Sequence, residues 1–200
     1  TRSSQSIAWK VEFWQYTDGY EQSLKKTVTG TATVTAKSSY TITYNANNGS
    51  GAPSSQTKWY GETLTLSSTA PTRSGYAFQG WATSASGGVS YKAGASYTTN
   101  ASATLYAVWK ANTYTIKFHV NGGSGTIANQ TKTHGVTLTL TKTVPTRANY
   151  TFLGWSASST ATSATWTAGG SYTDNQARTL YAVWKLAYVK PTIKSLSVNR

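Results

Sequence analysis

The chain has 200 residues, no cysteine, and 18 Lys and Arg against 5 Asp and Glu, which gives a formal net charge of +13. The lack of cysteine excludes disulfides and thiolate metal sites, and no apolar run approaches the roughly 20 residues that a membrane-spanning helix needs. The positive charge is spread along the chain, which favours weak attraction to polyanions over a specific nucleic-acid site.

The first predicted element is a β-hairpin. Residues 6–17 alternate, with Ile7, Trp9, Val11 and Phe13 on one side and Lys10, Glu12, Trp14 and Tyr16 on the other. Asp18-Gly19 predicts a turn, and residues 24–35 predict the second strand. Two strands alone are barely stable, so the apolar side should be buried. We expect residues 1–39 to end an upstream domain or to pack on the module that follows.

From residue 40 the chain repeats itself. Residues 40–110 return as 114–185, at an offset of 74 and, after one insertion, of 75. In each copy, alternating strands and Gly-rich turns lead to a Pro-Thr-Arg corner, a Tyr-x-Phe-x-Gly-Trp strand and a closing Leu-Tyr-Ala-Val-Trp strand. No apolar pattern keeps the helical period, so helix should be limited to a short turn near Pro71 or after Tyr97. The sequence predicts two mainly β modules, joined end to end by a three-residue linker.

Matched positions in the two copies predict the cores and the turns. The aromatic residues that recur in alternating strands are expected to be core; they are Trp81, Trp109, Trp155 and Trp184, with Tyr76, Phe78, Tyr106 and their partners. Asn48 stands where the second copy has Gly122, and Asn149 stands where the first has Gly75. Both residue types tolerate positive φ, so the turns should be kept.

Three strings carry a family resemblance: Tyr-Thr-Ile-Thr-Tyr-Asn-Ala-Asn-Asn-Gly at 40–49, Pro-Thr-Arg-Ser-Gly-Tyr-Ala-Phe-Gln-Gly-Trp at 71–81, and Leu-Tyr-Ala-Val-Trp at 105–109. Each copy resembles the Listeria-Bacteroides repeat, the family of the internalin B-repeat. The resemblance implies a small β-grasp-like module without catalytic residues, used in series on bacterial surface proteins and in phage tail proteins. Residues 191–200 are similar to the lead into a domain of minor structural proteins from phages of Gram-positive hosts. The run that follows Lys185 predicts that residues 186–200 connect to a downstream domain.

Titratable groups are too few to predict catalysis. Glu62 is the only acid between residues 40 and 110, and Asp174 is the only one between 114 and 185, whereas a glycosidase needs a pair of carboxylates. His119 and His134 stand where the first copy has Asn and Tyr, so the shared fold does not require them. A zinc site needs three or four ligands. We expect no enzyme activity, no cofactor and no metal.

Aromatic residues outside the matched set are the candidate binding residues. Trp59 and Tyr60 correspond to Thr and His in the second copy, so one module folds without them and their exposure is expected. Trp14 and Tyr16 share the strand face of Lys10. Flat rings beside hydroxyl and amide donors suit the apolar faces of sugars, and nearby Lys can meet phosphate of a teichoic-type polymer. These five residues are predicted to contact a glycan or a neighbouring domain.

The sequence predicts a non-enzymatic spacer or adhesion segment of a larger surface-exposed protein, in first place a phage tail or tail-tip component that contacts the host cell wall. Two alternatives stay open, the stalk of a bacterial cell-surface adhesin and an accessory carbohydrate-binding segment of a secreted hydrolase. The expected location is the virion or the bacterial cell surface. The expected partners are cell-wall polysaccharide or teichoic-type polymer and the neighbouring domains, with no specific nucleic acid and no membrane span.

Overall fold

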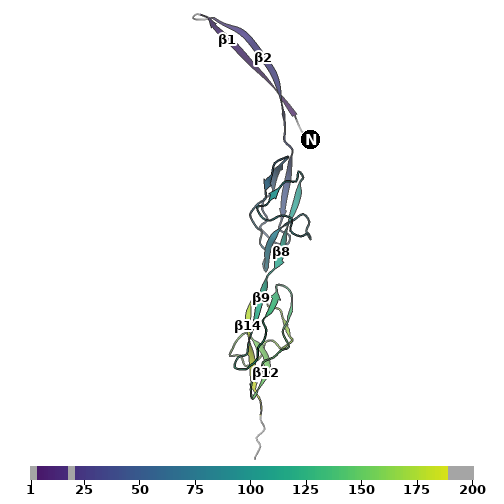
Figure 1. The fold of residues 1–200 in the computed structure, drawn as a ribbon, viewed down its shortest axis with the longest axis vertical. Coiled ribbons are helices and arrows are strands. Elements are labelled where there is room, and N and C mark those ends of the chain that lie inside the picture. Colours follow the sequence, from purple (N-terminus) through teal and green to yellow (C-terminus); the bar gives the residue numbers. More distant parts are fainter. Residues whose placement is uncertain (1–3, 18–20, 189–200) are drawn as a thin grey trace, which may run out of the picture. The chain divides into compact units, whose positions relative to one another are not determined.

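The computed structural model describes residues 4–17 and 21–188, with side chains for 6–13 and 26–188. Within these ranges the chain forms fourteen β-strands and no helix (Figure 1). The helical turn expected near Pro71 or after Tyr97 is therefore wrong: Thr72 forms a β-bridge with Ser50, and residues 98–102 form a loop with a bend. The chain divides into two compact units. The first contains residues up to Thr72 with Phe78–Val108, and the second contains Arg73–Ala77 with the residues from Trp109 onward.

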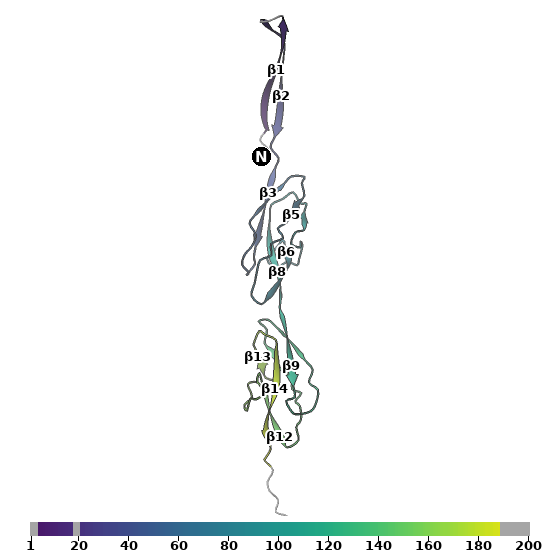
Figure 2. The same cartoon turned by 90° about the vertical axis from the view of Figure 1, so that its left-hand side faces the viewer.

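The N-terminal segment is the expected hairpin. Strand β1 (Ser4–Thr17) pairs antiparallel with β2 (Glu21–Thr35) as a two-stranded sheet (Figure 2). The predicted Asp18-Gly19 turn lies outside the described residues. The described chain does not bury the apolar side: Ile7, Trp9, Val11 and Phe13 are 45–52% exposed. Packing on the module that follows is therefore not seen, and burial by an upstream domain stays a prediction. They stay open because no further strand or second sheet of the described chain lies across this side.

The first repeat is built on a mixed four-stranded sheet in the order β4-β3-β8-β6. Its strands are β3 (Ser39–Asn45), β4 (Gln56–Trp59), β6 (Tyr76–Ala82) and β8 (Ala103–Ala111). The central strands β3 and β8 run parallel, and β4 pairs antiparallel with β3. A small second sheet joins β5 (Leu64–Thr65) to β7 (Ser96–Tyr97). This order has the β-grasp-like outline that the family resemblance implied.

The second repeat has the same order, β10-β9-β14-β12, with β9 and β14 parallel. Its sheet strands are β9 (Thr113–His119), β10 (Gln130–Thr133), β12 (Tyr150–Ser156) and β14 (Arg178–Leu186), and its small sheet pairs β11 (Leu138–Thr139) with β13 (Ser171–Tyr172). The prediction of a mainly β chain with two tandem repeat modules is confirmed.

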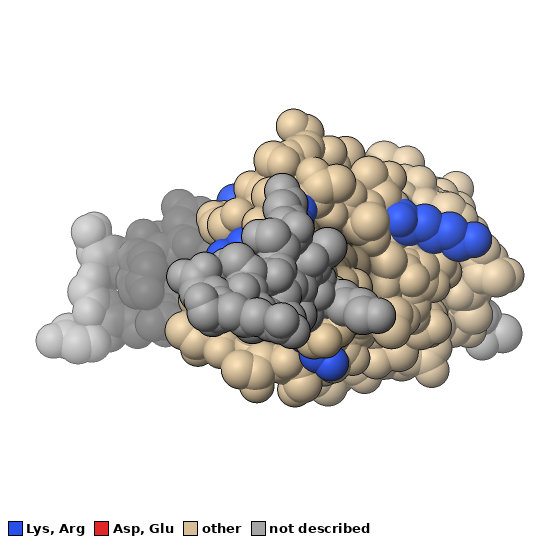
Figure 3. Space-filling view, turned by 90° about the horizontal axis from the view of Figure 1, so that it is seen from below, with Lys and Arg blue, Asp and Glu red and all other residues tan. Residues whose placement is uncertain are grey.

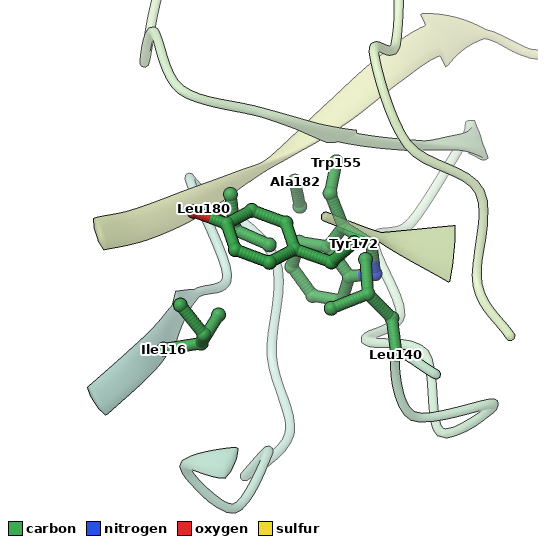
Figure 4. Close-up of a cluster of buried hydrophobic side chains, with 6 residues drawn as sticks. All are labelled: Ile116, Leu140, Trp155, Tyr172, Leu180 and Ala182. Atoms are coloured by element: carbon green, nitrogen blue, oxygen red, sulfur yellow. The ribbon is translucent and has the colours of Figure 1, made fainter. Parts of the chain in front are cut away.

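Each repeat encloses a core made by equivalent positions. Figure 4 shows the core of the second repeat, formed by Ile116, Leu140, Trp155, Tyr172, Leu180 and Ala182. The equivalent residues of the first repeat are also buried: Ile42, Leu66, Trp81, Tyr97, Leu105 and Ala107. Trp155 is fully buried, with the rings of Phe118 and Phe152 edge-on at centroid distances of 4.9 and 5.0 Å. A large ring at the centre lets so small a module bury enough apolar surface to fold.

The prediction of buried aromatic residues holds for Trp81 and Trp155 but not for every matched ring. The other rings of the predicted set are only partly buried; they are Trp109 and Trp184, with Tyr76, Phe78, Tyr106 and their partners Tyr150, Phe152 and Tyr181. The two outer tryptophans show why. Both stand near the end of the closing strand, beyond the centre of the core. Trp184 packs against the core from its rim, and its indole N–H donates to the carbonyl of Val120 at 3.2 Å. Its polar edge therefore has a partner where the core meets the surface.

The glycine of the Tyr-x-Phe-x-Gly-Trp strand permits a close backbone approach. Gly80 and Gly154 have φ of 143° and 140°. A Cβ added to either would lie 2.6 Å from the carbonyl oxygen of Tyr91 or 2.5 Å from that of Trp166. The backbone N–H of Trp155 donates to the same Trp166 carbonyl at 2.7 Å. The missing Cβ of the glycine thus lets the following loop come close enough to hydrogen bond with the backbone of the buried Trp.

The turns behave as the sequence predicted. Asn48 and Gly122 have φ of 68° and 82°, and Gly75 and Asn149 have φ of 77° and 63°. Asn and Gly are the residue types that enter this region at low cost. The exchanged residues therefore keep the same turn in both copies.

Candidate functional site

Trp59 and Tyr60 form an exposed aromatic pair where β4 ends. Their side chains are 44% and 46% exposed, which confirms the expected exposure. The backbone N–H of Tyr60 donates to the carbonyl of Ser38 at 2.9 Å, and Lys37 forms an ion pair with Glu62 beside it. A shallow hollow of about 290 Å³ opens there, lined by Thr35, Ala36, Lys37, Ser38 and Tyr60. The ring of Tyr60, two hydroxyls and a cation thus lie together, while binding at Trp59 and Tyr60 stays a prediction.

The other candidate residues lie on the hairpin. The ammonium of Lys10 forms an ion pair with Glu12, two residues along the same strand face. In the backbone register Trp14 is opposite Leu24, and Tyr16 is opposite Gln22. The side chains of Trp14 and Tyr16 lie outside the described part of the structure. Lys10 belongs to a different sheet from the Trp59-Tyr60 pair.

Two buried lysines were missed by the sequence reasoning. Lys58 is fully buried and Lys132 is 1% exposed, although lysine is among the residues most rarely buried. The Nζ of Lys58 donates to the carbonyl of Trp59 at 2.7 Å and to Oδ1 of Asn100 at 2.8 Å. The Nζ of Lys132 does the same with Thr133 and with Asn175, each at 2.8 Å.

In each repeat the asparagine that accepts from the buried lysine also accepts a backbone N–H, and we call this lysine–asparagine arrangement the lysine anchor. Oδ1 of Asn100 also accepts the backbone N–H of Gly61 at 3.0 Å, and Oδ1 of Asn175 accepts that of Gly135 at 2.9 Å. One amide oxygen therefore ties the end of a strand, the following turn and the loop before the closing strand. Among the described residues neither lysine forms an ion pair. The signal was present in the sequence, since Lys and Asn occupy matched positions in both copies.

The two histidines have roles inside the second unit. Nδ1 of His119 accepts the backbone N–H of Asn121 at 3.0 Å, just as Oδ1 of Asn45 accepts that of Asn47 at 2.8 Å in the first repeat. His119 therefore replaces a turn-forming Asn. Nδ1 of His134 is hydrogen bonded to the hydroxyl of Tyr114 at 3.0 Å.

The ring of His134 also lies over part of the Arg73–Ala77 segment. It meets the ring of Tyr76 edge-on at a centroid distance of 5.4 Å. A Cβ added to Gly75 would lie 2.1 Å from the imidazole. His134 thus packs on a backbone position that only glycine leaves open.

Each acidic side chain that the structure describes stands in its own ion pair. Glu62 pairs with Lys37, and Asp174 pairs with Arg178 at 3.3 Å. The described residues hold no group of three His, Asp or Glu side chains arranged to bind a metal ion. On the face in Figure 3, the described Lys and Arg side chains lie apart from one another. These arrangements suit surface ion pairs and diffuse attraction of anions.

Within the described ranges, no helix is long and apolar enough to cross a membrane.

Comparison with known proteins agrees with this geometry. The Listeria-Bacteroides repeat domain matches residues 40–108 and again residues 114–183. Internalin H of Listeria monocytogenes serovar 1/2a is 29% identical over 162 residues, which cover 78% of this chain and 28% of that protein. The chain thus spans less than a third of this relative, and no solved structure matches it. Both matches point to a non-catalytic repeat segment of a surface protein. The chain belongs to the Listeria-Bacteroides repeat domain family.

Proposed function

We propose that the chain is a non-enzymatic spacer and adhesion segment of a phage tail or tail-tip protein that contacts the host cell wall. One observation carries the proposal: both repeats close the same core around a central Trp, at Trp81 and Trp155. The described acids meanwhile stand in separate ion pairs. The repeated residues thus serve folding, and their duplication fits a building block better than a reaction centre.

The linker between the repeats supports a spacer. Strand β8 ends at Ala111 and β9 begins at Thr113, so a single residue lies between them. Within the second unit, the N–H of Asn112 donates to the carbonyl of Gly75 at 2.9 Å, and its carbonyl accepts the N–H of His134 at 2.8 Å. These bonds lie inside one compact unit, and a connection of one residue between strands is too short to act as a flexible tether.

Solution scattering tests the spacer. We expect a radius of gyration well above the roughly 16 Å of a compact globule of this length. A value near that of a globule would contradict a spacer made of two modules in series.

The adhesion part of the proposal rests on Trp59 and Tyr60. Both rings are exposed, and Tyr60 lines the hollow together with Lys37 and the hydroxyls of Thr35 and Ser38. Such a surface suits the apolar face of a sugar together with a nearby phosphate. We expect retention on cell-wall polysaccharide or on a teichoic-type polymer, and weaker retention as salt rises if phosphate takes part.

A double variant, Trp59→Thr with Tyr60→His, tests this site. It installs the residues that the second repeat carries at these positions, so the fold is expected to tolerate it. Loss of two stacking rings should weaken retention roughly ten-fold or more. Tyr188→Ala, which removes a ring that is 86% exposed elsewhere, is the control and should have no effect. The site is refuted if the wild-type chain is not retained, or if the double variant is retained equally well.

Two other assignments follow from the same geometry. A stalk of a bacterial cell-surface adhesin is favoured by the match to Internalin H, and an accessory carbohydrate-binding segment of a secreted hydrolase is favoured by the exposed Trp59. The reading frame that contains this chain distinguishes them. Neighbouring tail genes support the virion, a wall-sorting signal supports the adhesin, and a catalytic domain supports the hydrolase.

A further inference from the structure

The hairpin has one continuous apolar face. In an antiparallel pair, directly opposed residues point to the same side of the sheet. The register places Ile7 opposite Ala32, Trp9 opposite Gly30, and Val11 opposite Val28. With Phe13 and Val34 these residues form what we call the hairpin face: Ile7, Trp9, Val11, Phe13, Val28, Gly30, Ala32 and Val34.

This face is open to solvent along its length. Ile7, Trp9, Val11, Phe13 and Val34 are each 45–54% exposed, whereas the core residues of the repeats are at most 6% exposed. A two-stranded hairpin is marginally stable by itself, and a contiguous apolar patch of this kind marks a contact surface. Something outside the described chain is therefore expected to cover it.

The opposite side of the hairpin is polar. It carries Lys10 and Glu12 on β1 and a row of threonines on β2, Thr27, Thr29, Thr31 and Thr33. The hairpin is thus amphipathic with the period of a strand, and only one of its two sides calls for a partner.

Trp9 makes the hairpin face flat. A Cβ added to Gly30 would lie 2.4 Å from the indole of Trp9, so the ring lies across the backbone of β2. A flat apolar strip suits packing against another sheet at a spacing of about 10 Å, as in a sandwich.

We propose that the hairpin face is covered by the hairpin face of a second copy of the chain, related by a two-fold axis. A two-fold pair requires a surface that complements itself. Among the described side chains, the only charged one on the same side as the hairpin face is Lys26, opposite Phe13 at one end. In an antiparallel two-fold pair the two Lys26 side chains lie at opposite ends, so like charges do not meet.

The overall charge also permits this contact. The two strands carry three Lys and two Glu, nearly in balance although the whole chain is at +13. Repulsion between copies is therefore weakest at the hairpin.

The area is sufficient for a specific but modest interface. Trp9 and Phe13, each about half exposed, leave roughly 100 Å² of ring surface apiece. With the aliphatic side chains the face offers about 500 Å², and a pair would bury about 1,000 Å², the lower limit for a specific interface. We therefore expect a dimer that dissociates on dilution.

Sedimentation equilibrium across a concentration series tests the proposal on the full chain. We expect a mass approaching twice that of the chain at high concentration. Trp9→Thr with Phe13→Thr should remain a monomer, because threonine keeps strand propensity while removing the apolar surface. Lys10→Thr with Glu12→Thr alters the opposite side and should leave the dimer intact. Unchanged thermal unfolding of the repeats would show that the repeats of each variant are folded.

Cross-linking gives an independent readout because the chain contains no cysteine. Val11→Cys, near the middle of the face, should cross-link two copies through a short bis-maleimide. Thr29→Cys, on the polar side, should not. The proposal is overturned if the wild-type chain stays monomeric, if three or more copies assemble, if the Trp9→Thr and Phe13→Thr variant associates as the wild type does, or if the two cysteine variants cross-link equally.

Discussion

Replacing Asn175 by Ala should unfold the second repeat more readily than removing the lysine that it holds. Asn175→Ala deletes the oxygen that accepts both the Nζ of Lys132 and the N–H of Gly135, at 2.8 and 2.9 Å. A hydrogen bond to a buried charge contributes about 1.5–3 kcal/mol and a neutral one about 1 kcal/mol. We therefore expect a loss of about 3 kcal/mol, which lowers the Tm of a module of this size by roughly 10–20 °C.

Lys132→Met provides the contrast. Methionine has a similar shape and fills the buried position without a charge, and replacing a buried charge by an apolar group is often nearly neutral. We expect the free energy of unfolding to fall by about 1 kcal/mol. The carbonyl of Thr133 and Oδ1 of Asn175 each lose the Lys132 donor, but Oδ1 of Asn175 still accepts the N–H of Gly135. In the Lys132→Met background, Asn175→Ala should therefore cost less stability than it does in the wild-type chain, which corresponds to a coupling energy of about 2 kcal/mol between the two residues.

Urea and thermal unfolding of the full chain, followed by Trp fluorescence, measure these effects. Asn100→Ala is the matched variant, because Asn100 makes the equivalent bonds in the first repeat. Hydrogen exchange at the N–H of Gly135 reports the anchor locally. If Lys132→Met destabilises as much as Asn175→Ala, or if the two changes are additive, the buried lysine is not held through the asparagine as we infer.

Two further predictions concern substitutions that the repeats themselves suggest. Gly75→Asn should displace the ring of His134, because a Cβ at this position would lie 2.1 Å from the imidazole. The reverse exchange in the second repeat, Asn149→Gly, should change neither the His134 signal nor the stability. Imidazole NMR shifts and thermal unfolding compare the two variants, and an unmoved His134 signal in Gly75→Asn would contradict the contact. Burial raises the pKa of Tyr44, so above pH of about 10 the unfolded chain releases this proton first and the first repeat should lose stability as pH rises. Tyr44→Phe, the residue type at Phe118, should reduce this alkaline loss in a pH series of urea unfolding, and an unchanged pH profile would exclude Tyr44 as a source.

The repeat made much of the fold predictable. The two copies differ at about half of their positions, so the residues that both copies share indicate which positions the fold requires. Trp81 and Trp155 are such a shared pair, and both are buried. The same comparison identified Asn48 and Asn149 as turn residues with positive φ. Here local backbone sterics decide the conformation, so a sequence pattern is sufficient.

The candidate site was less predictable. Exposure of Trp59 was expected because the second repeat has Thr there. Burial of Lys58 was not, because a lysine in an alternating strand normally indicates the solvent side. Its partner Asn100 lies 42 residues further along the chain, and nothing local in the sequence reports that distance.

For the hairpin, the sequence predicted the strand but not the surroundings of its apolar side. Alternation from Ile7 to Phe13 predicted a strand with one apolar side, and β1 has it. Alternation does not say what covers that side, and in the described chain the side is open.

The sequence by itself determined the main strands, the turns and the central Trp of each core, because these depend on period-two alternation, on backbone sterics at Asn and Gly, and on which residues the two copies share. Tertiary structure decided the rest: the hydrogen bonds of the buried lysines to Asn100 and Asn175, the packing of His134 on Gly75, and the exposure of the hairpin face. These features join segments far apart in the chain or leave a surface without a neighbour. Their energies depend on desolvation and distance in three dimensions, which residue order alone does not encode.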